Sequence, residues 1–523
     1  MLRRREFIQT GIATAGAFAF GPAFWQDKFA AAAPAKVGRG PYGPLGPADL
    51  NGIRLPEGFS SREIARANAP VGSTGFVYPL FPDGQATYAL PDGGFILVTN
   101  SEVPTDGGGG ASAIRFSKTG AIEDAYRILG GTRGNCSGGA TPWGTWLSAE
   151  EYTGGRVWEC DPFGQKPAVV HPALGVFNHE AVAVDPDGER LYLTEDRGDG
   201  AFYRFTPANY PSLKSGRLEA AIVAANGRVT WKRVPDPLAT TKETRQQVPG
   251  YTKFRRGEGI WFDSGIVYVA TSSDGRVHAY NTTLETIELI YDEQSHKEPP
   301  LTDVDNVTVS ALSGDVFVCE DAGTLDIGII TPEGQVSKFL QLTGAQHGDP
   351  NTDASSETTG PVFDPSGTRF FFSSQRGFGT GVVYEITGPF RLERPRIPSP
   401  PGLRVDAASS RAIGRFRRSG LPVSVLVDEP AKVRVKLTTY LPRRGRANAS
   451  RKRLTLVKKT SSLSRRGGVD LRLRPSRKMR KRLRKRKKVT ARLTVRAVDA
   501  LGNVSTHTQL VQMRSGGRRP KKP

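Results

Sequence analysis

The sequence predicts an all-β protein, and three of its features support that prediction. Short stretches in which apolar and polar residues alternate recur along the chain, which is typical of strands with one buried face. Turn-forming residues are abundant, with 60 glycines and 38 prolines in 523 residues. Helical periodicity is nearly absent. Because 523 residues are many for one domain, we expect two or more folded units, and the 37% of hydrophobic residues are enough to build a core.

A single pattern recurs about six times between residues 75 and 390. It comprises a polar strand start, a strand, a turn of the Asp-Gly type, a second strand that ends in acidic or amide residues, a Gly-rich loop and a third strand. Clear copies begin at His179, Gly257, Asp305 and Thr359. With a fourth strand between copies, six such units predict a six-bladed β-propeller over residues 36–390. An array of β-sandwiches is the alternative, but its units would not share one register of acidic residues.

The C-terminal part of the chain differs sharply in charge. Residues 391–523 carry about 40 of the 73 lysines and arginines but about 6 of the 51 aspartates and glutamates. We interpret 391–402 as a Pro-rich linker, 403–513 as a small immunoglobulin- or fibronectin-like β-sandwich, and 514–523 as a basic disordered tail. The basic run at 476–488 is expected to be a solvated loop that adheres to anionic cell-wall polymers or lipid surfaces. Nucleic acid is the less favoured partner.

The first 35 residues are typical of an export signal. A basic start, an apolar stretch and a small-residue cleavage site follow one another, as they do in secretory signals. The segment RREFI, which begins at Arg4, resembles the twin-arginine signature. We therefore expect residues 1–35 to direct export by the twin-arginine route, to the periplasm, the cell wall or the medium. An ordinary secretory signal and an uncleaved anchor are the alternatives.

Polar residues return to two places in each repeat. The first is the start of the innermost strand, where Cys136 and Glu180 stand. The second lies about 14 or 15 residues later, where the next strand ends, as at Glu151 and Asp196. In an antiparallel sheet, the start of one strand and the end of its neighbour share an edge. Both sets of residues are therefore expected to converge on one mouth of the central channel.

This convergence predicts a metal centre. Many carboxylates cannot share a low-dielectric funnel as free anions, since their repulsion would raise their pKa values or open the structure. Bound cations remove the conflict, because Ca²⁺ suits a site with many oxygen ligands and Fe³⁺ suits one that a thiolate joins. Cys136 shares the register of the carboxylates, so we predict it to be a thiolate ligand. The predicted ligands are Glu102, Cys136, Glu150, Glu151, Glu180, Asp196, Glu258, Asp305, Glu320 and Glu357.

The plainer interpretation of each of these residues is structural. Acidic residues after strands are common in solvated turns, and a buried free cysteine usually behaves as a small hydrophobic residue. We keep that interpretation for Cys160 and Cys319. For the predicted ligands, the repetition of carboxylates at one place in the repeat argues against it.

Arg256 stands two residues before Glu258 at a strand start, so its guanidinium is expected to face the metals. A guanidinium beside cations is electrostatically unfavourable unless an anion lies between them. Because the N–H groups of arginine match a pair of phosphate oxygens, this position indicates an anionic substrate. We assign Arg256 a catalytic role, that of holding the anionic group of the substrate.

Several segments resemble the PhoX alkaline phosphatase family: NCSGGATPWGTWLSAEE from Asn135, NHEAVAVDP from Asn178, RGEGIW from Arg256 and DNVTVS from Asp305. The resemblance extends from the signal to about residue 390. It implies a six-bladed propeller, twin-arginine export and hydrolysis of phosphomonoesters at a cluster of Ca²⁺ and Fe³⁺. It also implies that Cys136 ligates iron and Arg256 faces the phosphate. The metal-binding glutamates that it implies are Glu151, Glu180 and Glu258.

Two other functions stay open. One is a Ca²⁺-dependent lactonase or phosphotriesterase-like hydrolase on the same propeller, which would bind a single catalytic calcium ion without a thiolate. The other is a non-catalytic surface protein whose propeller is stabilised by calcium. Ser101 and Ala149 depart from the family's pattern, which commonly has histidine and cysteine there. We expect a monomer that acts on a small phosphoester.

Overall fold

The computed structural model describes residues 34–348, 356–394, 401–441, 452–484, 486–500 and 502–515. The predicted signal, apart from its last two residues, lies outside this part of the chain, as do residues 395–400 of the predicted linker and the predicted tail beyond Ser515. Contacts divide the chain into two compact units, Met1–Ile397 and Pro398–Pro523. Both units consist mainly of β-strands, as predicted. No helix among the described residues is long and apolar enough to cross a membrane.

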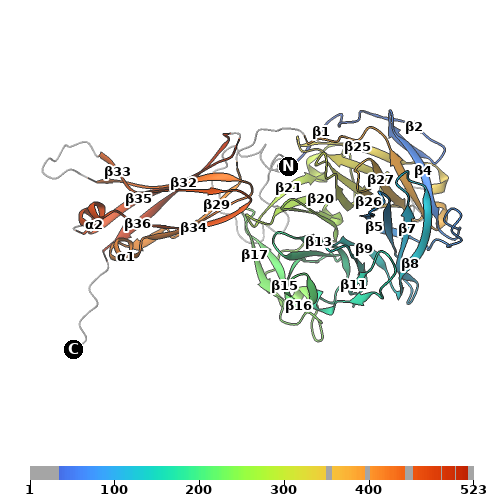
Figure 1. Cartoon of the computed structure of the whole chain (residues 1–523), viewed down its shortest axis with the longest axis horizontal. Coiled ribbons are helices and arrows are strands. Elements are labelled where there is room, and N and C mark those ends of the chain that lie inside the picture. Colours follow the sequence, from blue (N-terminus) through green and yellow to red (C-terminus); the bar gives the residue numbers. More distant parts are fainter. Residues whose placement is uncertain are drawn as a thin grey trace. The chain divides into compact units, whose positions relative to one another are not determined.

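The strands of the first unit form six small sheets (Figure 1). The first sheet contains β5 (Pro82–Ala89), β6 (Phe95–Ser101), β7 (Gly109–Phe116) and β8 (Ile122–Thr132). The second contains β9 (Asn135–Ala140), β10 (Trp146–Glu150), β11 (Val157–Cys160) and β12 (Val169–Val170). The third contains β13 (His179–Asp185), β14 (Arg190–Glu195), β15 (Phe202–Asn209), β16 (Ser212–Val223) and β17 (Val229–Arg233).

The other three sheets follow in chain order. The fourth contains β18 (Gly257–Asp263), β19 (Ile266–Thr271), β20 (Arg276–Asn281) and β21 (Thr286–Asp292). The fifth contains β22 (Val304–Val309), β23 (Val316–Glu320), β24 (Asp326–Ile330) and β25 (Gln335–Leu342), together with β1 (Lys36–Val37), β2 (Leu45–Ala48) and β3 (Ile53–Pro56). The sixth contains β26 (Thr358–Phe363), β27 (Arg369–Ser374), β28 (Val382–Thr387) and β4 (Ser60–Arg66). Short 3-10 helices lie in loops at Pro172–Leu174, Arg245–Gln247, Ser272–Asp274, Glu293–Ser295, Ala345–His347 and Gly377–Gly379.

The first strands of the six sheets contact one another in a closed order. Strand β5 contacts β9, β9 contacts β13, and the order continues through β18 and β22 to β26, which contacts β5 again. Strand β4 hydrogen-bonds to β28 and so ties the beginning of the unit to its end. In Figure 1, β5, β9, β13 and β26 lie towards the middle of the unit, whereas β4, β8 and β16 lie towards its periphery. This arrangement is consistent with the predicted β-propeller.

Glycine allows the first strands to pack closely. A Cβ atom on Gly259 of β18 would lie 2.6 Å from the Cα atom of Asn306 on β22. A Cβ atom on Gly84 of β5 would lie 2.5 Å from the Cα atom of Ser137 on β9. Both distances are far below a normal contact between carbon atoms. The first strands therefore come close enough for side chains from different sheets to share one site.

The second unit contains two sheets that share one apolar core. The smaller sheet consists of β29 (Leu403–Ala407), β31 (Leu421–Val427) and β34 (Gly467–Leu473). The larger has the order β30 (Ser410–Ala412), β36 (Val504–Arg514), β35 (Lys488–Val498), β32 (Ala431–Leu441) and β33 (Lys452–Leu463), and α1 (Ile413–Ser419) follows β30 in the chain. Buried side chains of both sheets, among them Val425 and Val435, belong to one cluster. Two sheets packed in this way are consistent with the predicted sandwich.

The prediction of a loop for the basic run at 476–488 is wrong in part. The run contains α2 (Arg477–Leu483), which begins after Ser476. The Ser476 hydroxyl accepts a hydrogen bond from the Met479 N–H over 3.4 Å, which caps the helix. Met479 and Leu483, four residues apart on one helix face, are both buried in the core of the unit. These two apolar residues stabilise a helix in a run that is otherwise almost entirely charged.

Candidate metal centre

One pair of opposite residues recurs in all six sheets of the first unit. It joins the start of the first strand to the end of the second. The pairs are Pro82 with Ser101, Asn135 with Glu150, His179 with Glu195, Gly257 with Thr271, Val304 with Glu320, and Thr358 with Ser374. In every sheet the pairing register then shifts at an irregularity close to this pair. Such a β-bulge bends the strand and re-aims its side chains.

The residue after each member of a pair points to the side opposite that member, because successive side chains of a strand alternate. These residues make up two sets of six, which we call the start ring and the end ring. The start ring follows the first member of each pair and consists of Asp83, Cys136, Glu180, Glu258, Asp305 and Thr359. The end ring follows the second member and consists of Glu102, Glu151, Asp196, Ser272, Asp321 and Gln375. Together the two rings carry eight carboxyl groups and one thiol.

The same backbone hydrogen bond holds every residue of the end ring. The N–H of that residue donates to the carbonyl oxygen of the residue just before the first strand, with N···O distances between 2.7 and 3.3 Å. In the second sheet, for example, the Glu151 N–H donates to the Gly134 oxygen over 2.7 Å. In the fourth sheet, the Ser272 N–H donates to the Arg256 oxygen over 3.1 Å. The backbone, and not the chemistry of the side chains, therefore fixes where the end ring lies.

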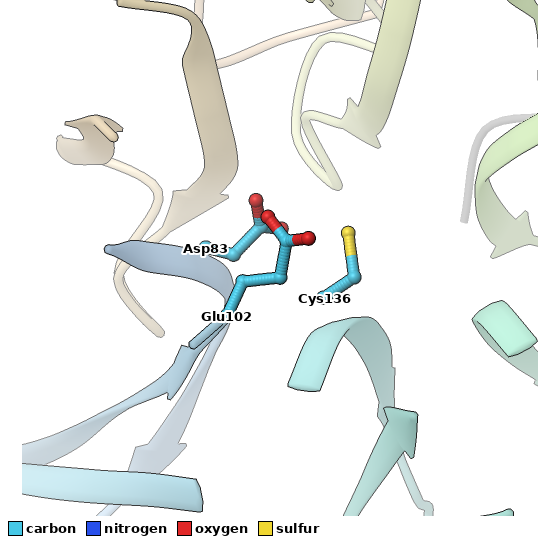
Figure 2. Close-up of side chains that lie close together, drawn as sticks. All are labelled: Asp83, Glu102 and Cys136. Carbon is cyan, nitrogen blue, oxygen red and sulfur yellow. The ribbon is translucent and has the colours of Figure 1, made fainter. Parts of the chain in front are cut away.

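Side chains of both rings gather into three overlapping clusters. The clusters are Asp83–Glu102–Cys136, Cys136–Glu151–Glu180 and Glu180–Glu258–Asp305, and the candidate ligand atoms within each lie within 4.8 Å of one another. Figure 2 shows the first cluster, in which the carboxyl groups of Asp83 and Glu102 lie next to each other and the Cys136 sulfur points to the same space. The Cys136 thiol donates to Glu180 Oε1 over 3.3 Å. Because Cys136 and Glu180 each belong to two clusters, the clusters form one continuous site.

Burial and mutual repulsion raise the pKa values of the acidic groups in the first cluster. Burial raises the pKa of Asp83 to about 6, although a hydrogen bond from Gln375 opposes part of the shift. Burial and the negative charge of Asp83 raise the pKa of Glu102 to about 7. Burial, followed by the charges of Asp83 and Glu180, also raises the pKa of the Cys136 thiol well above its ordinary value.

The same two causes act in the rest of the site. Burial first, and neighbouring carboxylates second, raise the pKa values of Glu151, Glu180, Glu258 and Asp305 well above those of ordinary carboxyl groups. Protonation would relieve the repulsion, but so would bound cations, which keep carboxylates ionised and convert a thiol to a thiolate. The acidic groups therefore fit metal ions chemically.

An uncompensated oxygen in the site supports this fit. Gln375 Nε2 donates to Asp83 Oδ2 over 2.8 Å and to Glu102 Oε2 over 2.6 Å. Its Oε1 is buried and has no hydrogen-bond partner among the described residues. A buried amide oxygen without a donor is unfavourable, and a cation beside it would remove the cost. The described part of the chain thus offers carboxylate, amide and thiol ligands in one place.

The clusters differ in the metal that their atoms suit. Glu180, Glu258 and Asp305 offer only carboxylate oxygens, which hard cations such as Ca²⁺ prefer. Both other clusters add the sulfur of Cys136, a ligand that suits a transition metal better than Ca²⁺. The donor atoms of the clusters therefore differ in the kind of cation that they suit.

Arg256 contacts carboxylates of both rings. Its Nε and Nη2 donate to the two oxygens of Asp196 over 2.9 and 3.1 Å, and the same Nη2 lies 3.4 Å from Glu258 Oε1. Its Nη1 donates to Asp321 Oδ2 over 3.3 Å. The backbone of Arg256 has a φ of +48°, a left-handed conformation that is uncommon for residues other than glycine. The prediction placed this guanidinium beside the acidic cluster, and the structure places it there with 41% of its side chain exposed.

A second arginine, which the sequence analysis did not single out, stands nearby. Arg376 forms an ion pair with Glu357 and also interacts electrostatically with Glu102 and Asp321. Its side chain is 43% exposed, so this guanidinium also reaches solvent. Asp321 therefore lies under the influence of two arginines from different sheets.

Two of the predicted ligands belong to the recurring pairs and not to the rings. Glu150 accepts hydrogen bonds from the N–H groups of Arg133 (3.4 Å) and Arg156 (3.1 Å). Glu320 accepts them from the N–H groups of Thr302 (2.7 Å) and Asp326 (2.9 Å). Both carboxylates thus satisfy backbone donors in or next to their own sheets, and neither belongs to the three clusters.

The other predicted ligands lie in or beside the site. Cys136, Glu102, Glu151, Glu180, Glu258 and Asp305 belong to the clusters, Asp196 holds Arg256, and Glu357 holds Arg376. Sequence reasoning missed Asp83 as a candidate. Its signal is the segment PDGQATY from Pro82, which places an aspartate one residue into the first strand, as Glu180 is in the third sheet.

The raised pKa values predict an unusual pH dependence for the metal-free protein. In the unfolded chain these carboxyl groups ionise near pH 4 to 4.5, whereas Asp83 and Glu102 in the folded chain ionise at about 6 and 7. The folded state therefore binds more protons between these values, and stability is lost as the pH rises through this window. We expect the melting temperature in a chelator to fall between about pH 5 and pH 8. Added Ca²⁺ should restore it most at the higher pH.

Scanning calorimetry of the chelated and Ca²⁺-loaded protein across this range checks the prediction. A chelated protein whose melting temperature rises steadily over the same range would contradict the crowding of acidic groups at this site.

Solved structures of similar shape are only distantly related to this chain. A gluconolactonase from Xanthomonas campestris is 14% identical, with 67% of this chain and 99% of that chain covered, at a TM-score of 0.37. A protein of unknown function from Bacteroides thetaiotaomicron is 12% identical, with 65% and 83% covered, at a TM-score of 0.40. At such TM-scores these likenesses carry no conclusion about this chain.

Sequence relationship is more informative. No curated protein matches the chain at a significant level. Residues 106–288, however, match the sequence model of the family described as alkaline phosphatase PhoX. That segment contains Cys136, Glu151, Glu180, Arg256 and Glu258, which contribute to all three clusters or lie beside them. The match confirms the resemblance over residues 106–288, the part of the chain that is similar to the PhoX alkaline phosphatases.

Proposed function

We propose that this protein is an exported, metal-dependent phosphomonoesterase. It would hydrolyse phosphate esters at a cluster of Ca²⁺ and Fe³⁺ in the channel of a six-bladed propeller. The observation that carries the proposal is the continuous run of three acidic clusters through Cys136 and Glu180, flanked by the exposed guanidinium of Arg256. The family match over the segment that holds these three residues supports phosphoester chemistry. Residues 1–35 support export by the twin-arginine route.

We assign the metals by the atoms that each cluster offers. Glu180, Glu258 and Asp305 would hold Ca²⁺, whereas Cys136 with its neighbouring carboxylates would hold Fe³⁺. Bound cations would orient the phosphoryl group and neutralise the negative charge that grows on its oxygens during in-line displacement. The protein's own part is to fix the ligands, and the repeated backbone hydrogen bond of the end ring does so.

Arg256 would hold the phosphate from the solvent side of the cluster. Asp196 occupies Nε and Nη2 of its guanidinium, which fixes the plane of the group. One N–H of Nη1 donates to Asp321, so the second N–H of Nη1 and the N–H of Nη2 beside Glu258 are the groups that would donate to phosphate oxygens. Arg376 adds a second positive charge on the side of Asp321. A phosphate dianion is thereby attracted to the mouth of a site that would otherwise repel it.

An assay of three substrate classes tests the proposed reaction. Mature protein supplied with Ca²⁺ and iron should hydrolyse p-nitrophenyl phosphate at alkaline pH, with far lower rates on bis(p-nitrophenyl) phosphate and on gluconolactone. A chelator should abolish the activity, because the metals supply the charge neutralisation.

Two outcomes of this assay would contradict the proposal. Turnover of the diester or the lactone without the monoester would favour the lactonase or phosphotriesterase-like alternative. Chelation that lowers the melting temperature while none of the three substrates is cleaved would favour a calcium-stabilised binding protein.

Substitution of Arg256 tests its role separately. Arg256→Gln should lower kcat/KM for the monoester by about 10²- to 10³-fold, the loss typical of a preorganised charged donor, and Arg256→Lys should recover only part of it. Arg197→Gln is the matched control, since Arg197 is similarly exposed and contacts Thr153 and Glu243 but no cluster residue. Metal content should be unchanged in all three variants. Full activity in Arg256→Gln would refute the assignment.

A further inference from the structure

The larger sheet of the second unit has an unusual charge distribution. Its five strands contain no aspartate or glutamate at all. The acidic residues of the described second unit lie on the smaller sheet or in turns: Asp406, Asp428, Glu429, Asp470 and Asp499. The strands of the larger sheet therefore supply no carboxylate to offset their own cations.

Strand alternation places the cations of this sheet on one face. On β32, Val433, Val435 and Leu437 are buried in the core, and the intervening basic residues are exposed. The same alternation holds on β35. We call the resulting surface the basic face, and it consists of Lys432, Arg434, Lys436, Lys458, Lys488, Arg492, Arg496 and Arg514.

Like charges lie directly opposite each other across the strands of the basic face. The register pairs Arg434 with Arg496, Lys436 with Lys458, and Lys488 with Arg514. Directly opposed like charges destabilise a sheet, whereas opposite charges in these positions would stabilise it. An external anion that lies between such cations would relieve their repulsion.

We infer that the basic face binds a linear phosphodiester polymer, such as a chain of glycerol phosphate units. Exposed cations recur about every 7 Å along a strand, and adjacent strands lie about 4.8 Å apart, so the face offers rows of positive charge to an extended polyanion. Guanidinium groups suit phosphate oxygens, and exposed hydroxyls such as Thr490 and Thr460 lie among them. This inference does not depend on the proposed phosphatase activity.

The composition of the face argues against two other partners. Strands β33, β35 and β36 contain no phenylalanine, tyrosine or tryptophan, and β32 contains one tyrosine, Tyr440, so the row of aromatic platforms on which single-stranded nucleic acids stack is missing. Leu510 is the one large apolar side chain exposed on β36, whereas membrane-bound surfaces usually insert several. A flexible polyanion needs neither feature.

A pair of charge-matched variants of the mature full-length protein tests the inference. Binding to immobilised poly(glycerol phosphate) is measured from low salt to about 300 mM salt, where a polyanion contact weakens linearly with the logarithm of salt. Arg434→Gln/Lys436→Gln/Arg496→Gln removes three cations of the basic face and should weaken binding by about tenfold or more, with a shallower salt slope. Arg415→Gln/Arg418→Gln/Arg472→Gln removes three exposed cations of α1 and β34, outside the basic face and outside the run 476–488, and should change the affinity by less than about twofold.

Two further measurements make the outcome decisive. The face variant should melt at the same temperature as the wild type or higher, because it loses opposed like charges, so weak binding cannot be ascribed to unfolding. Equal weakening in both variants would overturn the inference in favour of an unspecific effect of net charge. It would also be overturned if the wild type does not bind the polymer, or binds vesicles of anionic lipid or duplex DNA more tightly.

Discussion

Eight carboxyl groups and a thiol meet where the first strands of the first unit come together, and the backbone gives them little freedom to separate. Each residue of the end ring is held by the same backbone hydrogen bond, and each start-ring residue lies beside a strand irregularity that recurs in all six sheets. Repulsion cannot be relieved by a local rearrangement that keeps the sheets intact. Protons or cations must therefore balance the negative charge. The stability of the unit consequently depends on the pH and on the cations that it binds.

The charged residues of the end ring are distributed unevenly around the unit. The end ring is acidic in four sheets but has Ser272 in the fourth and Gln375 in the sixth. Those two sheets are also the ones that supply the arginines, since Arg256 precedes the fourth sheet and Arg376 follows Gln375. An arginine thus stands next to each position where the end ring lacks a carboxylate, and the side chains of both arginines reach solvent. The site therefore places two guanidinium groups directly beside carboxylates that could hold cations.

Much of this site could be predicted from the sequence, because strand alternation and repeat length are local properties. The repeat predicted that strand starts and strand ends would converge, and Cys136, Glu180, Glu258 and Asp305 do so. The sequence could not decide which of two adjacent acidic residues faces the site. The prediction includes both Glu150 and Glu151, and it includes Glu320 instead of Asp321. Which of two adjacent residues faces the site depends on where its strand ends relative to the bulge in the paired strand. That register is a property of the paired strands and not of either alone.

In the second unit, too, the sequence does not reveal how the strands pair. Alternation predicted its strands, but the like-charge pairs among β32, β33, β35 and β36 appear only once the register between strands is known. The helix α2 was missed because charged residues surround its two buried apolar side chains. In both units, local patterns indicated the elements, and the pairing between elements determined the surfaces on which function depends.

The most direct test of the central claim is the metal content of the native protein. Elemental analysis of mature protein purified without added metal should find both calcium and iron, and the Cys136→Ser variant should keep its calcium but lose most of its iron. The Cys160→Ser variant, which removes a buried cysteine outside the three clusters, should keep both metals. A native preparation with neither calcium nor iron would contradict the claim that cations balance the crowded acidic groups.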